Sequence, residues 1–83
     1  MNDSTVGVDD QRGLSTYTIY YQPELRPPYR VRRFAVVAGK ALPQEVIGVG
    51  EDLESARQVI PPSADFCFPA ELGDAPEIVE TWI

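Results

Sequence analysis

Arginine and aromatic residues fall close together in the first half of the sequence, and they are the residues best suited to bind an anion. They are Tyr20, Tyr21, Arg26, Tyr29, Arg30, Arg32, Arg33 and Phe34. Guanidinium groups bind phosphate, and aromatic rings on a sheet stack on unpaired bases. This pattern predicts a nucleic-acid-binding surface whose candidate residues are Arg26, Arg30, Arg32, Arg33 and Tyr29.

A second interpretation of the same residues places the aromatic rings in the core and leaves the arginines solvated or paired with Glu77 and Glu80. The sequence pI of about 4.4 favours this interpretation, because the phosphate contacts that dominate nucleic-acid affinity require a basic domain. Nucleic acid is therefore the less favoured partner.

Few residues could carry catalysis. The chain has no histidine and one cysteine, which excludes Ser-His-Asp and Cys-His catalysis and mixed Cys/His metal sites. Cys67 stands between Phe66 and Phe68, and apolar surroundings make a thiol inert. Carboxylates such as Glu45 and Glu51 form no pair of defined geometry. We expect no catalytic residue, no cofactor and no metal, and the single cysteine favours the reducing cytoplasm.

The charged residues are unevenly distributed along a chain whose net charge is −6. Residues 22–43 carry five basic residues and one acidic residue, whereas residues 44–83 carry nine acidic residues and one basic residue. The two parts could neutralise each other inside one fold, or they could present a positive and a negative patch to separate partners. Self-neutralisation is the favoured interpretation, because opposite charges lie close together in any small domain.

The chain has 83 residues and a mass of 9.2 kDa, which is the size of one small domain. Residues 1–13 show no hydrophobic period and are predicted to form a flexible tail, so the domain is expected to cover residues 14–83. No apolar run approaches the roughly 20 residues needed to cross a bilayer, so we expect no membrane association.

Three strands and one helix are predicted in the first sixty residues. Residues 15–21 and 29–37 are rich in β-branched and aromatic residues, and residues 44–50 form a third strand with two glycines. The phase of the second strand changes near Arg32 and Arg33, which predicts either a bulge there or a distal half that is covered on both faces. Asp52 precedes an apolar stripe at helical spacing that ends before Pro61, which predicts a short helix with Asp52 as its N-cap.

The last part of the sequence contains an apolar stretch at residues 65–68 and a terminal strand at residues 77–83. If Val79, Thr81 and Ile83 face the core, the candidate protein-binding residues Ile78, Glu80 and Trp82 face outward. The predicted fold is α+β, with a single antiparallel sheet of four to five strands, one short helix packed on one face, and the order β-β-β-α-(β)-β.

The stretch from Ala41-Leu42-Pro43 to Ser55-Ala56 resembles the strand-then-helix piece of HicB-type antitoxin domains. The resemblance implies a small regulatory protein, and no functional residue is carried over from it.

These observations favour a small, non-catalytic cytoplasmic module that binds protein through an acidic surface and an open sheet edge. The terminal strand is the predicted edge, and pairing of that edge in two copies would give a symmetric homodimer. The alternatives are a nucleic-acid-binding protein that uses the arginine strand, and an acidic inhibitor of phage type that imitates nucleic acid.

Overall fold

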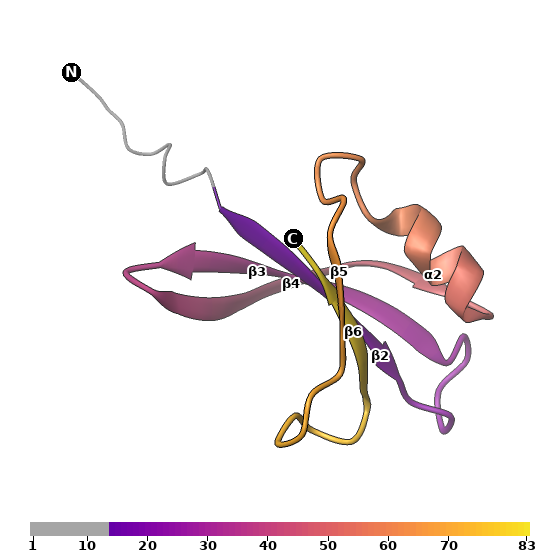
Figure 1. Ribbon diagram of the computed structural model, residues 1–83. Helices are drawn as coiled ribbons and strands as arrows, with labels where there is room; N and C mark the ends of the chain where they lie inside the picture. The colour runs from indigo at the N-terminus through magenta and orange to yellow at the C-terminus, as the bar shows by residue number, and fades with distance from the viewer. Residues whose placement is uncertain (1–13) are drawn as a thin grey trace.

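The computed structural model of the protein describes residues 14–83, and the predicted tail at residues 1–13 lies outside the described residues. The described chain forms one five-stranded antiparallel sheet and one short helix, which confirms the predicted α+β fold (Figure 1). The strands are β2 (Ser15–Tyr21), β3 (Tyr29–Val37), β4 (Lys40–Gly50), β5 (Cys67–Pro69) and β6 (Ile78–Trp82), and the helix is α2 (Leu53–Val59). In the described residues, no helix is long and apolar enough to span a membrane.

The first three strands form a meander, and β3 and β4 extend from it as a long hairpin (Figure 1). The hairpin turns at Ala38 and Gly39, whose φ angles are 52° and 78°. Two consecutive positive φ angles are typical of the tight turn whose twist matches that of the flanking strands. The third strand was predicted at residues 44–50, but β4 begins earlier, and residues 40–43 belong to this edge strand. An edge strand tolerates Pro43 because one side of its backbone needs no partner.

The predicted bulge exists, but it lies on β4 and not on β3. Strand β3 pairs with β2 in one unbroken register, whereas its register with β4 shifts between Val31 and Arg32 and again between Arg32 and Phe34. The extra residues on β4 are accommodated at the free edge, where a bulge disturbs only one ladder. Strand β3 therefore keeps its alternation, and Phe34 lies on the opposite face from Val31.

Helix α2 begins and ends where its sequence predicts. The Asp52 side chain accepts a hydrogen bond from the Ser55 backbone N–H at 2.8 Å, as an N-cap does. The backbone at Ile60 is extended, and Pro61 follows it. The helix is only seven residues long, so packing on the sheet has to stabilise it.

Two glycines of β4 allow that packing. A Cβ on Gly48 would lie 2.6 Å from Val59 Cγ1, and a Cβ on Gly50 would lie 2.7 Å from the backbone nitrogen of Ala56. Any other residue would push the helix away from the strand. Glycine within a strand marks weak packing, a bulge or the close approach of another segment. The close approach of the helix explains both glycines here.

After α2 the chain crosses to the far edge of the sheet. Strand β5 forms that edge, and β6 returns between β5 and β2, so the strand order is β4-β3-β2-β6-β5. The prediction that the terminal strand is an open edge was wrong, because the short segment at residues 67–69 forms a strand and covers it. Strand β6 is paired on both sides, so a homodimer formed by pairing of β6 would require displacement of β5.

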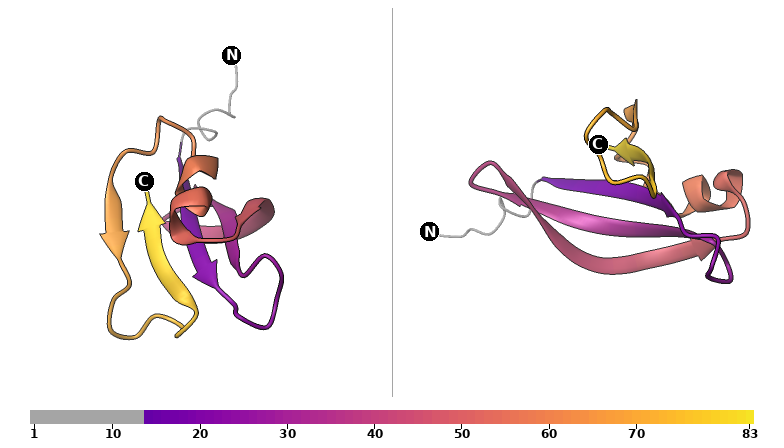
Figure 2. Two further views of the ribbon diagram at one scale, coloured as in Figure 1. Left: turned by 90° about the vertical axis from the view of Figure 1, so that its right-hand side faces the viewer. Right: turned by 90° about the horizontal axis from the view of Figure 1, so that it is seen from below.

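The core lies between the helix and one face of the sheet. Ile19, Val31 and Ala56 are fully buried and form its centre. Figure 2 (right) shows α2 and the β5–β6 hairpin on the same side of β2, β3 and β4. Among residues 14–83, no helix or strand covers the opposite face of the sheet, which we call the uncovered face.

Candidate functional site

The uncovered face combines basic, aromatic and aliphatic side chains. Register and alternation assign its residues: Thr16, Thr18 and Tyr20 from β2, Arg30, Arg32 and Phe34 from β3, Val46 and Val49 from β4, Phe68 from β5 and Thr81 from β6. Val46, Val49 and Phe68 expose 39%, 40% and 46% of their surface. Val46 and Val49 lie on the edge strand β4, and Phe68 lies on the opposite edge strand β5.

A cleft of about 170 Å³ opens on this face. It is lined by Tyr20, Gln22, Arg30, Arg32, Val46 and Glu77. Strands β2, β3 and β4 each contribute a wall. Glu77 is the residue before β6, and its backbone oxygen accepts a hydrogen bond from the Tyr21 N–H at 2.8 Å, which holds it beside the cleft. The cleft therefore has two guanidinium groups, one carboxylate and an aliphatic wall.

The Arg30 side chain has an unsatisfied donor in this cleft. Its Nε atom is buried, and among residues 14–83 no acceptor lies within hydrogen-bonding distance of it. A buried donor without a partner loses its hydration without compensation, so nearly all such groups in folded proteins find an acceptor. Because the Nε atom has less than 1 Å² of accessible surface, a molecule in the cleft could contact it only after the Arg30 side chain moves.

Other polar groups of the cleft interact with groups of the protein itself. Arg32 Nη1 donates a hydrogen bond to the backbone oxygen of Gln44, which fixes its guanidinium over the bulged part of β4. Burial raises the pKa of the Tyr20 hydroxyl above 10.0, the positive charge of Arg32 lowers it, and the negative charge of Glu77 raises it. Arg32 and Glu77 thus both lie close enough to Tyr20 to act on the same hydroxyl group.

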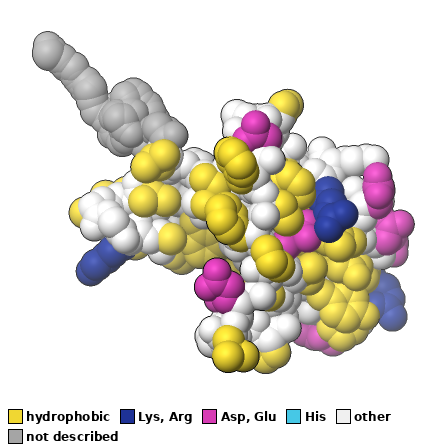
Figure 3. Space-filling model, viewed as in Figure 1, with side chains coloured by type: hydrophobic (Ala, Val, Ile, Leu, Met, Phe, Trp, Pro, Cys, Tyr) yellow, Lys and Arg dark blue, Asp and Glu magenta, His cyan; other side chains and the backbone are white. Residues whose placement is uncertain are grey.

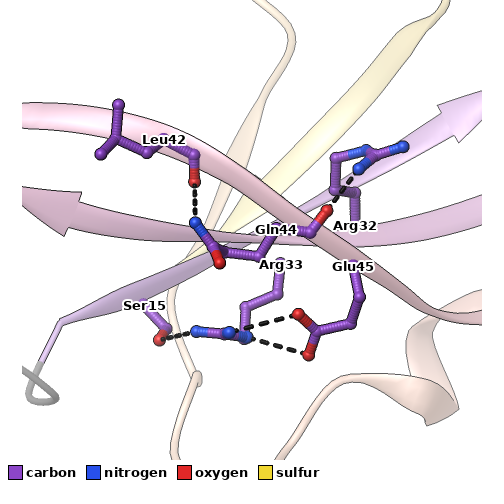
Figure 4. Close-up of polar contacts among 6 residues, drawn as sticks. All are labelled: Ser15, Arg32, Arg33, Leu42, Gln44 and Glu45. Atoms are coloured by element: carbon purple, nitrogen blue, oxygen red, sulfur yellow. Dashed lines mark hydrogen bonds and ion pairs between the residues drawn. The ribbon is translucent and has the colours of Figure 1, made fainter.

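The predicted nucleic-acid-binding residues do not form one surface. Arg33 points to the helix side of the sheet, where its Nε and Nη2 atoms each donate to a Glu45 carboxylate oxygen at 3.2 Å (Figure 4). Arg26 lies in the β2–β3 loop, and its Nη1 donates to the backbone oxygens of Pro23 and Leu25 at 2.8 Å. Tyr29 packs against the core on the helix side, so only Arg30 and Arg32 remain on the uncovered face.

The predicted outward orientation of Glu80 and Trp82 was wrong. Glu80 is only 5% exposed and lies on the helix side, where its carboxylate accepts hydrogen bonds from Arg57 Nε at 2.7 Å and Nη2 at 2.9 Å. Trp82 Nε1 donates to the same carboxylate at 2.8 Å, and the ring packs against the core. These contacts fix α2 to β6. They lower the pKa of Glu80 below 4.5, chiefly through the hydrogen bonds from Arg57.

The third candidate of the terminal strand, Ile78, is half-buried and pairs with Tyr20 across a bulge. Ile78 therefore lies on the uncovered face with Tyr20, whereas Glu80 and Trp82 lie on the helix side, so the three candidate residues do not share one surface.

Acidic side chains are scattered and do not form one continuous patch on the side of the molecule seen in Figure 3. Several have intramolecular roles, since Glu45 pairs with Arg33, Asp52 caps the helix and Glu80 holds Arg57. The Arg33–Glu45 pair joins the basic and acidic parts of the sequence, so self-neutralisation occurs at one place at least.

Cys67 is a free, exposed thiol on β5. Desolvation raises its pKa above 9.0, and the nearby negative charge of Glu80 raises it further. The thiol is therefore a weak nucleophile, as expected from its aromatic neighbours, although it is exposed and not buried between them. Among the described residues no three His, Cys, Asp or Glu side chains gather where they could hold a metal ion.

Comparisons with known protein families, with curated proteins and with solved structures find no match to this chain. The resemblance of residues 41–56 to HicB-type domains thus has no support from these comparisons.

Sequence reasoning missed the role of Val46 and Val49. Their partners on β3 are Arg32 and Arg30, and this pairing places an aliphatic wall beside the two guanidinium groups. The alternation of apolar residues around Gly48 was the available signal for these two valines. The bulge at Ile47 interrupts this alternation, so Val46 and Val49 do not stand out as residues of one face.

Proposed function

We propose that this chain is a small protein-binding module of the cytoplasm, without catalytic activity, that binds its partner through the uncovered face of its sheet. The observation that carries the proposal is the exposure of apolar side chains on this face, Val46 and Val49 on β4 at one edge of the sheet and Phe68 on β5 at the other edge. Exposed apolar side chains beside polar residues are a feature of surfaces that associate with other proteins.

The edges of the sheet are less suitable than its face. Strand β4 carries Pro43 and two register shifts, and β5 is only three residues long. Short strands, prolines and bulges are features that hinder the addition of a further strand. We therefore place the binding surface on side chains of the uncovered face and not on the backbone of an edge.

Localisation in the cytoplasm is supported by the exposed free thiol of Cys67. Exposed thiols persist in reducing compartments and are oxidised elsewhere.

Affinity capture from the native cell tests the proposal with two matched substitutions. Val49→Lys places a charge on the uncovered face at a side chain that is already 40% exposed, and Leu72→Lys makes the same change at a fully exposed position in the β5–β6 connection. A partner retained by the parent and by Leu72→Lys but lost by Val49→Lys supports the proposal. Retention by Val49→Lys contradicts it, provided that circular dichroism shows both variants folded.

A further inference from the structure

A second cleft, of about 420 Å³, opens at the end of the sheet where β2 stops, and we call it the loop-end cleft. It lies between the end of β2 with the loop that follows and the segment before β6, two parts of the chain that meet at this end of the sheet (Figure 1). The lining residues are Tyr21, Gln22, Pro23, Glu24, Pro76 and Glu77. We propose that the loop-end cleft binds a basic side chain, arginine or lysine, of a partner protein.

This inference goes beyond the proposed function, because it does not use the exposed valines of β4 or Phe68. The loop-end cleft shares Gln22 and Glu77 with the cleft on the uncovered face. Its charged walls are two carboxylates, however, and no guanidinium group lines it. The two clefts therefore attract ligands of opposite charge.

The first observation is the charge of the walls. Glu24 and Glu77 are the charged lining residues, and among residues 14–83 neither forms an ion pair with a basic side chain. Arg26 follows in the same loop, but its guanidinium donates to the backbone oxygens of Pro23 and Leu25 and does not line the cleft. Two carboxylates without a counter-charge attract a cation and repel an anion, and the net charge of −6 adds to this attraction.

The second observation is that these groups are accessible. Glu24 is exposed and Glu77 is half-buried, and both face the space of the cleft. The volume of about 420 Å³ lies within the range of about 300–1,000 Å³ that is usual for ligand pockets. A side chain can therefore enter the cleft and contact both carboxylates.

The third observation distinguishes a basic side chain from a metal ion. Hard cations such as Mg²⁺ and Ca²⁺ take about six or more oxygen ligands, and among the described residues no three metal-ligating side chains gather. The remaining walls include the Tyr21 ring and two prolines. An aromatic ring attracts a cation over its face, and proline carbon can pack against the methylene stem of lysine or arginine.

The Tyr21 ring is already held in place. It packs against the Tyr29 ring with the centroids 4.9 Å apart, and Tyr21 still exposes 43% of its surface. A side chain that is fixed before the ligand arrives loses little conformational freedom on binding. The aromatic wall of the cleft is therefore preorganised for a cation.

The test measures binding of a fluorescein-labelled peptide of alternating arginine and glycine by fluorescence anisotropy, in about 0.15 M NaCl to screen exposed charges. The parent should bind the peptide. Glu77→Gln should lose about fivefold or more in affinity, because a charge-assisted contact is removed. Glu24→Gln should also weaken binding, and so should Tyr21→Leu, which keeps an apolar side chain but removes the aromatic ring.

Asp65→Asn is the matched control, since it removes one negative charge at an exposed position. Asp65 lies at the opposite end of β6 from Glu77, beside Phe66, whose N–H donates to the Ile83 oxygen. The affinity of this variant should change by less than about twofold, because a distant exposed charge contributes little. Circular dichroism checks that every variant is folded.

Nuclear magnetic resonance locates the bound peptide. In a ¹⁵N-labelled protein, the side-chain amide signal of Gln22 and the backbone signals of Tyr21 and Glu24 should shift when the peptide is added. The backbone signals of Val46 and Val49, on the uncovered face, should stay in place. A peptide in which neutral citrulline replaces arginine should shift none of these signals.

Three results would overturn the inference. They are no binding of the arginine peptide by the parent, equal weakening in Glu77→Gln and Asp65→Asn, and displacement of the peptide by MgCl2 but not by NaCl of the same ionic strength. The proposed function is tested separately by the capture experiment with Val49→Lys. Its failure would leave this site intact, because Val49 does not line the loop-end cleft.

Discussion

Replacement of Gly48 by alanine tests how closely helix α2 approaches the sheet. The added Cβ would lie 2.6 Å from Val59 Cγ1 and 2.8 Å from Cγ2, whereas non-bonded carbon atoms settle at about 3.5–4.0 Å. Relief of such a contact requires the helix or the β-branched side chain to move, and overpacking of this kind costs about 1–3 kcal/mol. In open space the same substitution would stabilise a strand by about 0.5–1 kcal/mol. A loss of stability therefore indicates close contact with the helix, and a gain indicates open space.

The assay is urea unfolding of the parent, Gly48→Ala, Val59→Ala and the double variant. Val59→Ala removes both γ carbons and leaves only the Cβ of residue 59, at 3.2 Å from the new methyl group. Most of the overlap is then relieved, and the two substitutions should show a favourable coupling of about 1 kcal/mol or more. For a domain of this size, each kcal/mol lost lowers the melting temperature by about 4–8 °C.

Gly50→Ala is the matched control for this cycle. A Cβ there would meet the backbone nitrogen of Ala56 at 2.7 Å, and Val59→Ala does not relieve that contact. Its effect should therefore add to that of Val59→Ala. The reasoning is refuted if Gly48→Ala is as stable as the parent, or if its effect simply adds to that of Val59→Ala.

Two further predictions concern titratable groups around β6. Because Arg57 holds the pKa of Glu80 below its ordinary value of 4.5, the stabilisation from ionised Glu80 is present above that pH and is lost as the pH falls through the lowered pKa. Glu80→Gln should therefore be clearly less stable than the parent at about pH 7 and closer to it at about pH 2.5 in denaturant titrations, and a constant difference would contradict the assignment. Because the pKa of Cys67 is raised, its alkylation by iodoacetamide at about pH 8 should be slower than that of an unstructured cysteine peptide, and an equal or faster rate would show that the thiol is not desolvated.

The parts of the fold that sequence reasoning predicted are those specified by local patterns. The β-branched runs of β2 and β3 form strands, and Asp52 with Pro61 sets the limits of the helix. Each of these signals acts within a few residues, so neighbours in the sequence are sufficient to identify it.

The parts that failed depend on partners distant in the sequence. The alternation of Ile78–Trp82 allows two orientations, and the cost of a lone buried carboxylate favours the one that keeps Glu80 in water. Arg57, 23 residues earlier, supplies the missing partner. It is the only basic residue after position 43, and that isolation was the available signal. The order of β5 and β6 had no local signal, because β5 has three residues and all are exposed.

The candidate site was predicted only in part. Arg30 and Arg32 were identified by residue type, but their separation from Arg33 and Tyr29 follows from strand alternation without a bulge in β3. The prediction placed the bulge on the wrong strand, and a shift of one residue moves every later side chain to the other face.

The position of β6 has a consequence for synthesis on the ribosome. Residues 78–82 complete the sheet between β2 and β5 and supply the carboxylate that holds Arg57, so a nascent chain that stops at residue 77 has a helix whose guanidinium lacks its acceptor. A stop codon ahead of this segment would leave one side of β2 unpaired and would remove Val79 and Trp82 from the packing against the core, so the loss would reach beyond one end of the chain.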